Sequence, residues 1–117
     1  MTSDGLEKIC KALKGTTTDI KWGADLCYLV GKKMYCVTSL EGSVRASFKV
    51  TPEDFGELTE REGIIPAPYM AKNFWVMVEK PSALTAKEWK SYVAGSYSMV
   101  LEKLPKKLQE SILKSKS

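Results

Sequence analysis

Basic side chains and aromatic rings alternate along the middle of this 117-residue sequence, and together they have the chemistry to hold a polyanion. Lysine and arginine attract phosphate groups, while aromatic rings offer flat apolar surface beside them. The residue pattern alone favours a simpler interpretation, in which the lysines are ordinary solvated side chains and the rings belong to the core. The residues on which this choice depends are Trp22, Lys32, Lys33, Arg45, Lys49, Tyr69, Lys72 and Trp75.

Residue patterns for catalysis or metal binding are scarce. The sequence contains no histidine, which excludes Ser-His-Asp triads, Cys-His pairs and His-ligated zinc. Its eight glycines are dispersed and form neither a phosphate-binding glycine motif nor a nucleophile elbow. The acidic residues that follow position 51 are more simply explained as a solvated helix face than as a metal or general-acid site. We therefore expect a protein that is not an enzyme and that uses no cofactor or metal ion.

Three cysteines, Cys10, Cys27 and Cys36, are odd in number and have no C-x-x-C spacing, which favours reduced buried thiols in a cytoplasmic protein. A two-residue turn at 31–32 would pair strand residues whose numbers add up to 63, so that Cys27 would face Cys36. Two alternatives follow for this pair: packed thiols, which we favour, and a disulfide formed on oxidation. A catalytic thiol at either position would need a base other than histidine.

The net charge of +4 is unevenly distributed along the chain. Residues 51–70 hold one arginine against five acids, a local charge of −4, so the rest of the chain carries +8. One acidic segment inside an otherwise basic chain predicts a surface with a basic side, which is suited to phosphate. No stretch approaches the roughly 18 apolar residues of a membrane-spanning helix. The first 15 residues also lack the apolar core of a secretory signal.

Local patterns predict a single α+β domain over residues 1–117, a two-layer fold in which an antiparallel sheet packs against helices. Its tail from about residue 113 is expected to be frayed. The first half should begin with a helix that is capped by Ser3 or Asp4 and ends at Gly15, followed by a polar connector at 16–18. Strands are then expected over 26–30, 33–40 and 44–50, the last with Arg45 and Lys49 on its solvent face. The second half should hold a helix from Pro52 that ends at Gly63, an extended apolar loop over 63–69, a strand over 73–79 with both faces covered, a long helix after the capping box at Thr85, and a short helix after Pro105.

The order of its motifs resembles that of the MmcQ/YjbR-like family of small bacterial proteins. The resemblance covers residues from about 6 to 105, and its motifs are weak singly but specific in combination. One departure is Ala24-Asp25, where the family often has a histidine or an aspartate followed by proline. The matching motifs are Trp22-Gly23, Val30-Gly31-Lys32-Lys33-Met34-Tyr35, Ala46-Ser47-Phe48-Lys49-Val50, the GIIPAPY segment of 63–69, Lys72, Trp75-Val76-Met77-Val78, and Ser96-Tyr97 with the later Leu104-Pro105.

This resemblance implies a two-layer fold with an antiparallel sheet backed by helices. It also implies DNA binding through two projecting β-hairpins, described as a double wing. On that hypothesis the chain is a cytoplasmic, monomeric DNA-binding protein of low sequence specificity that has no membrane partner. The residues expected to contact phosphates are Lys32, Lys33, Arg45, Lys49 and Lys72.

An alternative hypothesis is a non-enzymatic interaction module that holds a protein or a small apolar ligand. Its surface would be the Pro66–Tyr69 loop with the neighbouring rings of Trp22, Tyr69 and Trp75. The loop is more apolar than a plain surface connection needs to be, which favours a contact role. Complete burial of Tyr69 and Trp75, with no groove beside them, would argue against this alternative.

Overall fold

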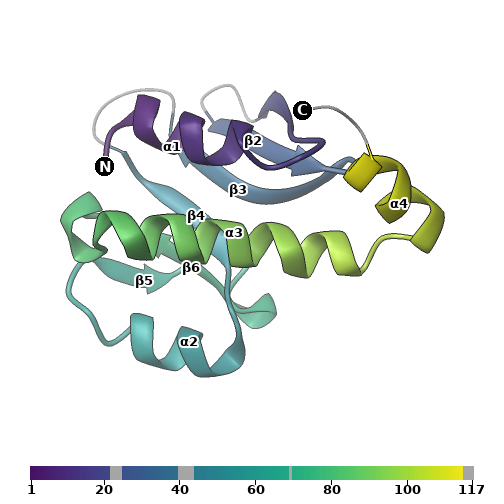
Figure 1. Cartoon of the computed structure of the whole chain (residues 1–117). Helices are drawn as coiled ribbons and strands as arrows, with labels where there is room; N and C mark the ends of the chain where they lie inside the picture. Colours follow the sequence, from purple (N-terminus) through teal and green to yellow (C-terminus); the bar gives the residue numbers. More distant parts are fainter. Residues whose placement is uncertain (22–24, 40–43, 69, 115–117) are drawn as a thin grey trace.

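The computed structural model describes residues 1–21, 25–39, 44–68 and 70–114, and within these ranges a six-stranded antiparallel sheet is backed by helices (Figure 1). This is the predicted α+β architecture. The elements, in chain order, are α1 (Ser3–Lys11), β1 (Thr17–Lys21), β2 (Asp25–Val30), β3 (Lys33–Ser39), β4 (Ala46–Lys49), α2 (Pro52–Leu58), β5 (Ile64–Pro66), the 3₁₀ turn η1 (Ala71–Asn73), β6 (Trp75–Val78), the 3₁₀ turn η2 (Pro81–Ala83), α3 (Ala86–Glu102) and α4 (Lys106–Lys114).

The strands lie in the order β1-β2-β3-β4-β6-β5, and every neighbouring pair is antiparallel. β6 is therefore an interior strand. Both of its faces are covered, as predicted, because Val76 and Val78 lie in the main core while Trp75 and Met77 belong to a cluster on the other face. The apolar segment that precedes it contributes a short edge strand, β5, in place of a loop. The two prolines nearby suit this position, because an edge strand can do without some ladder hydrogen bonds.

Helix α3 forms the middle of the helical layer and runs across the sheet in Figure 1. It begins at the predicted capping box, in which the Thr85 hydroxyl accepts from the Glu88 N–H and the Glu88 carboxylate accepts from the Thr85 N–H. Trp89, Val93 and Tyr97 on its inner face are buried in the main core. α1 packs beside α3, and α2 contacts β5 and β6. No helix among the described residues is long and apolar enough to cross a membrane.

The β2–β3 hairpin contains a β-bulge that changes its predicted register. Leu29 pairs with Met34 as a two-residue turn requires, but the register then shifts by one, so that Tyr28 pairs with Cys36 and Cys27 pairs with Val37. The prediction that Cys27 faces Cys36 is therefore wrong. A one-residue shift turns side chains to the other face of the sheet. Cys36 accordingly lies in the main core and Cys27 in a separate cluster on the opposite face, and both thiols are free.

The first strand, β1, was not apparent in the sequence, where residues 16–18 resemble a polar connector. Its side chains are mostly exposed on both faces, so it lacks the alternation that marks a half-buried strand. Ladder pairing with β2, from Thr17 opposite Leu29 to Lys21 opposite Asp25, holds it at the edge of the sheet. The cap of α1 also differs from the prediction, since Thr2 accepts from the Gly5 N–H.

A small apolar cluster covers the face of the sheet that lies away from the helices. Ala67 and Met70, from the connection between β5 and β6, pack there against side chains of β2, β3 and β6. Ser47 of β4 lies on this side and is only 4% exposed. The predicted solvent face of β4 is therefore wrong at Ser47, and Lys49 is half-buried, while Arg45 is exposed. The cause is the connection, which folds over an interior strand.

Candidate anion-binding groove

A groove of about 500 Å³ opens where the start of β3, the end of β4, the η1 segment and the carboxyl end of α3 meet. Three lysines line it, together with methionine, tryptophan and aliphatic side chains, and no carboxylate of the described residues is among its lining groups. The lining residues are Lys33, Met34, Lys49, Met70, Asn73, Trp75, Val100, Lys103 and Leu104.

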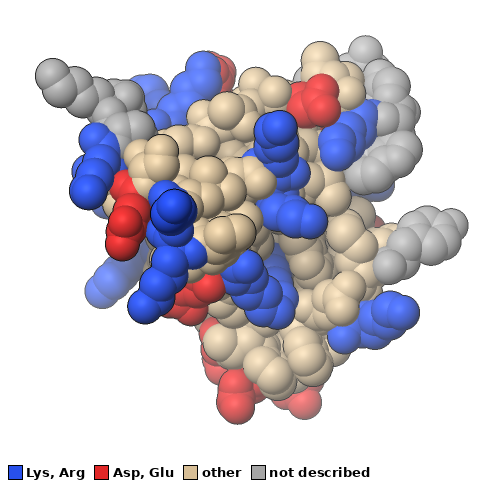
Figure 2. Space-filling view, turned by 90° about the vertical axis from the view of Figure 1, so that its right-hand side faces the viewer, with Lys and Arg blue, Asp and Glu red and all other residues tan. Residues whose placement is uncertain are grey.

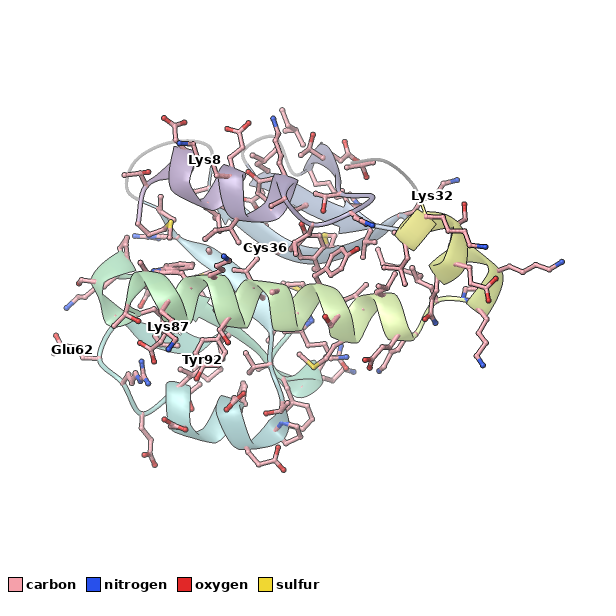
Figure 3. The ribbon with its side chains drawn as sticks, in the orientation of Figure 1. Lys8, Lys32, Cys36, Glu62, Lys87 and Tyr92 are labelled. Atoms are coloured by element: carbon pink, nitrogen blue, oxygen red, sulfur yellow. The ribbon has the colours of Figure 1, made fainter. Side chains whose placement is uncertain are left out.

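The β2–β3 turn brings Lys33 to the groove. Gly31 and Lys32 have φ angles of 57° and 67°, the left-handed pair that a type I′ hairpin turn requires. A Cβ added at Gly31 would lie 2.5 Å from Leu104 Cδ1, so the turn packs directly against the junction of α3 and α4. Figure 3 shows Lys32 at the end of the molecule where α4 lies. The turn is thus anchored on a helix corner, in contrast to the freely projecting hairpin that the family resemblance implies.

Lys49 is held by a buried serine of α3. The Ser96 hydroxyl accepts from the Lys49 backbone N–H at 2.9 Å and donates to the Tyr35 carbonyl at 2.6 Å. This chain of two hydrogen bonds joins β4 to the bulged part of β3 through the helix. It fixes the point at which the Lys49 side chain leaves the sheet, beside the last turns of α3.

The lysines of the groove repel one another. Burial lowers the pKa of Lys49 from its ordinary value, and the neighbouring Lys103 ammonium group lowers it further. The ion pairs among the described residues use Lys11, Arg61 and Lys80, and none of them involves Lys33, Lys49 or Lys103. The groove therefore has an uncompensated positive charge, which a bound anion would neutralise.

Two other predicted lysines are neighbours in sequence of residues that line the groove. Lys32 immediately precedes Lys33 at the exposed turn, and Lys72 in η1 precedes Asn73. Both side chains are exposed. Figure 2 views the molecule from this end, where lysine and arginine side chains spread across the middle of the face and acidic side chains lie mainly toward its margins.

Arg45 lies apart from the other predicted basic residues. It precedes β4 at the end opposite Lys49, and its carbonyl accepts from the Ser39 N–H at the far end of β3. At about 3.3 Å per residue, the four positions between Arg45 and Lys49 amount to about 13 Å. Arg45 is not among the residues that line the groove.

The predicted aromatic surface is described only in part, because Trp22 and Tyr69 lie outside the described residues. Trp75 is 7% exposed and packs in the cluster on the outer face of the sheet, yet it also lines the groove. Trp75 is therefore a core residue with one edge open to a ligand. Because a groove adjoins it, the condition that would argue against the alternative interaction module is not met at Trp75.

Sequence reasoning missed Lys103, Met34 and Met70. The available signal for Lys103 was its spacing from Val100 on the long helix, since residues three positions apart share a helix face. Contact of that face with Lys49 depends on how α3 crosses the sheet, which no local pattern encodes. The cysteines take no part in the groove, and all three are buried. The described residues include no cluster of cysteine, aspartate and glutamate side chains suited to a metal ion.

Comparison with known proteins assigns the chain to a family. A family model described as YjbR matches residues 11–99, about three quarters of the chain. The chain belongs to the YjbR family. Lys33, Lys49 and Trp75 lie within the YjbR match, whereas Lys103 and Leu104 lie beyond its end. A search of curated proteins gives no match.

Solved structures with the YjbR-type fold agree with this assignment. A Deinococcus radiodurans protein with a DUF419 domain is 27% identical, with a TM-score of 0.86, and the alignment covers 95% of this chain and 87% of that one. A Pseudomonas syringae protein is 24% identical, with a TM-score of 0.69, and the alignment covers 85% of this chain and 98% of that one. The first supports both the family and the fold, and the second the fold alone.

Proposed function

We propose that this YjbR-family chain is a non-enzymatic, cytoplasmic DNA-binding protein of low sequence specificity that acts as a monomer. The basic groove and its edge would contact the phosphate backbone. Backbone contacts position a protein on DNA without reading its sequence, and lysines are suited to that role. The proposed contacts come from Lys32, Lys33, Lys49, Lys72 and Lys103, while Arg45 would extend the contact only if DNA reached the far end of β4.

The observation that carries this proposal is the convergence of Lys33, Lys49 and Lys103 on one groove with no lining carboxylate among the described residues. Lysines whose only role is to keep a surface soluble have no reason to cluster in one groove. Here one of them is half-buried, and a second lies close enough to lower its pKa. Such an arrangement costs free energy in the unbound protein and is favourable when an anion is present.

The backbone on both sides of the groove takes left-handed conformations that fix the shape of its margins. Among the described residues, the non-glycine residues with positive φ are Lys32, at 67°, and Phe74, at 61°. Lys32 is the neighbour of Lys33, and Phe74 lies between the lining residues Asn73 and Trp75. Lys32 takes this conformation as part of the type I′ turn, and Phe74 takes it as the residue that ends η1.

A salt titration of DNA binding tests the proposal. Fluorescence anisotropy with a labelled duplex should give a plot of log K against log salt with a slope of about −3 to −4.5, which corresponds to three to five phosphate contacts. The double variant Lys49→Gln/Lys103→Gln should reduce that slope by about 2, because two contacts are lost. The matched control is Lys87→Gln/Lys90→Gln, which makes the same charge change in exposed lysines at the other end of α3.

The proposal fails if the protein binds neither duplex nor single-stranded DNA at low salt. It fails equally if the groove variant and the control variant lower affinity by the same amount, since binding would then follow net charge alone. The variant Arg45→Gln measures how far the DNA contact extends along β4. If the slope of log K against log salt is unchanged in this variant, the contact is confined to the groove end of the sheet.

Binding of a small ligand is a second candidate function. The favouring observation is that Met70 and Trp75, from the segment around the predicted Pro66–Tyr69 loop, line a groove whose volume of about 500 Å³ is in the range of small-molecule sites. Titration with a panel of aromatic carboxylates and phosphates, followed by chemical-shift changes at Met70 and Trp75, tests this function. Shifts confined to exposed lysines would contradict it.

A further inference from the structure

The apolar wall of the groove is more than phosphate binding needs. Below the lysines lie the side chains of Met34, Met70, Trp75, Val100 and Leu104. A phosphodiester is contacted by cations and N–H donors and gains nothing from thioether or indole surface. Methionine, in contrast, adapts its shape to flat apolar groups, and a tryptophan edge offers contact to an aromatic ring. The wall therefore calls for a ligand with an apolar, planar part next to its anion.

Double-stranded DNA leaves this wall unused, because its bases are stacked inside the helix and its outer surface is phosphate and sugar. A nucleotide with an unpaired base has both required parts next to each other, since its phosphate and its base are joined through a single sugar. Proteins that bind single strands combine the same two features, cations along the backbone and apolar or aromatic surface under the bases.

We propose that the groove binds a nucleotide whose base is unpaired, with its phosphate between Lys49 and Lys103 and its base against the wall formed by Met34, Met70 and Trp75. This inference rests on the proposed function and specifies the form of nucleic acid that the site prefers. The nucleotide can come from a single-stranded segment or from a free nucleoside monophosphate, and both sources share the recognised chemistry.

Lys33 stands on the side of the groove formed by the β2–β3 turn, whereas Lys49 and Lys103 face each other from the sheet and the helix. A phosphate bound between the latter two relieves their mutual repulsion. Binding should then restore the pKa of Lys49 toward its ordinary value, because the anion favours the protonated form. Affinity should consequently fall as the pH rises through the lowered pKa of Lys49.

Competition between single and double strands tests the preference. The probes are a labelled 12-nucleotide single strand and a blunt duplex of the same sequence, measured by anisotropy at one salt concentration. The single strand should bind at least about fivefold more tightly, the smaller end of what one base contact contributes. Adenosine 5′-monophosphate should displace the strand at a lower concentration than inorganic phosphate does.

The displacement series also distinguishes the two sources. Displacement at a mononucleotide concentration similar to that of the strand assigns the site to free nucleotides. Displacement only at a concentration far above that of the strand assigns it to single-stranded segments. Either result supports the inference. Inorganic phosphate that competes as well as the mononucleotide overturns it, because the base would then make no contact.

Two variants locate the effect. Met34→Gln keeps the side-chain length and all charges but removes apolar surface from the wall, so it should bring single-strand affinity to within about threefold of duplex affinity. Lys87→Gln, at the far end of α3, should leave the preference intact (Figure 3 shows this end). Circular dichroism spectra that match wild type confirm that both variants are folded.

Failure of the inference and failure of the proposed function give different results. Equal affinity for single strand and duplex, with both weakened by Lys49→Gln/Lys103→Gln, overturns the unpaired-nucleotide site and leaves DNA binding standing. Absence of binding to either strand form overturns both. Single-strand preference that survives Met34→Gln unchanged also overturns the site, since the wall would then not be its source.

Discussion

Removal of the Ser96 hydroxyl is the most direct test of how the helical layer positions the groove. This oxygen is buried, and the side chain is 0% exposed. It accepts from the Lys49 N–H at 2.9 Å and donates to the Tyr35 carbonyl at 2.6 Å, so Ser96→Ala removes two hydrogen bonds with one atom. The void left by one oxygen is small, but two backbone groups lose their partner.

The expected cost follows from those two groups. Leaving one buried donor or acceptor without a partner costs about 1–3 kcal/mol. The Lys49 N–H is partly buried and water reaches it more readily than the Tyr35 carbonyl, so the sum should lie near 2–4 kcal/mol. Alanine's higher helix propensity offsets this by about 0.5 kcal/mol. With an m value of about 1.5 kcal/mol/M, a net loss of about 2.5 kcal/mol lowers the urea midpoint by about 1.7 M.

Urea unfolding followed by circular dichroism measures the effect. The matched control is Ser98→Ala, two residues along the same helix at an exposed position, which should change stability by less than about 0.5 kcal/mol. A loss below 1 kcal/mol for Ser96→Ala, or a loss equal to that of Ser98→Ala, would refute the reasoning. Folded Ser96→Ala should also bind DNA more weakly than Ser98→Ala, because Lys49 loses its anchor.

Three further predictions concern the scaffold. Gly31→Ala should lower the free energy of unfolding, measured by urea denaturation, by about 1–3 kcal/mol, because the position has a φ of 57° and no room for a Cβ. A change below about 0.5 kcal/mol would contradict the packing of this turn against Leu104. Glu88→Gln should cost about 0.5–1 kcal/mol at pH 7 through loss of the Arg61 ion pair, because glutamine can still accept the Thr85 N–H and complete the capping box. Hydrogen bonds from Arg61 and Thr85 lower the pKa of the Glu88 carboxyl from 4.5 to about 2. The stability difference between wild type and Glu88→Gln should therefore persist above pH 4.5 and vanish as the pH falls toward 2. A stability difference that stays constant across an acid titration would contradict this pKa shift. Mild oxidation of the folded protein should give no disulfide between Cys27 and Cys36, which lie on opposite faces of the sheet, and peptide mapping by mass spectrometry will detect the linked peptide if this is wrong.

Features that depend on near neighbours in the chain were predictable. The caps at Thr51 and Thr85 and the left-handed turn after Val30 each rest on residues within three or four positions of one another, and the structure contains all three. Two apolar faces along 75–78 likewise predicted an interior strand, because burial on both sides leaves a direct mark on composition.

Features that depend on pairing between strands were less predictable. The bulge near Tyr28 shifts the register by one residue, and this single step moves Cys36 to the helical face and Cys27 to the other. β1 left no alternating pattern because it is an exposed edge strand. Both outcomes follow from the energy of the assembled sheet, to which residues distant in sequence contribute.

The chain by itself determined the local elements, the absence of histidine chemistry and the excess of basic residues outside 51–70. It also pointed to Lys33, Lys49 and Trp75. The tertiary structure decided that these three meet Lys103 in one groove and that Arg45 does not. The physical reason is that Lys33 and Lys49 belong to different strands and Lys103 to the end of a helix, 16 and 54 positions apart along the chain. Their meeting is set by the packing of α3 across the sheet, which the Ser96 hydroxyl reinforces by joining Lys49 of β4 to Tyr35 of β3.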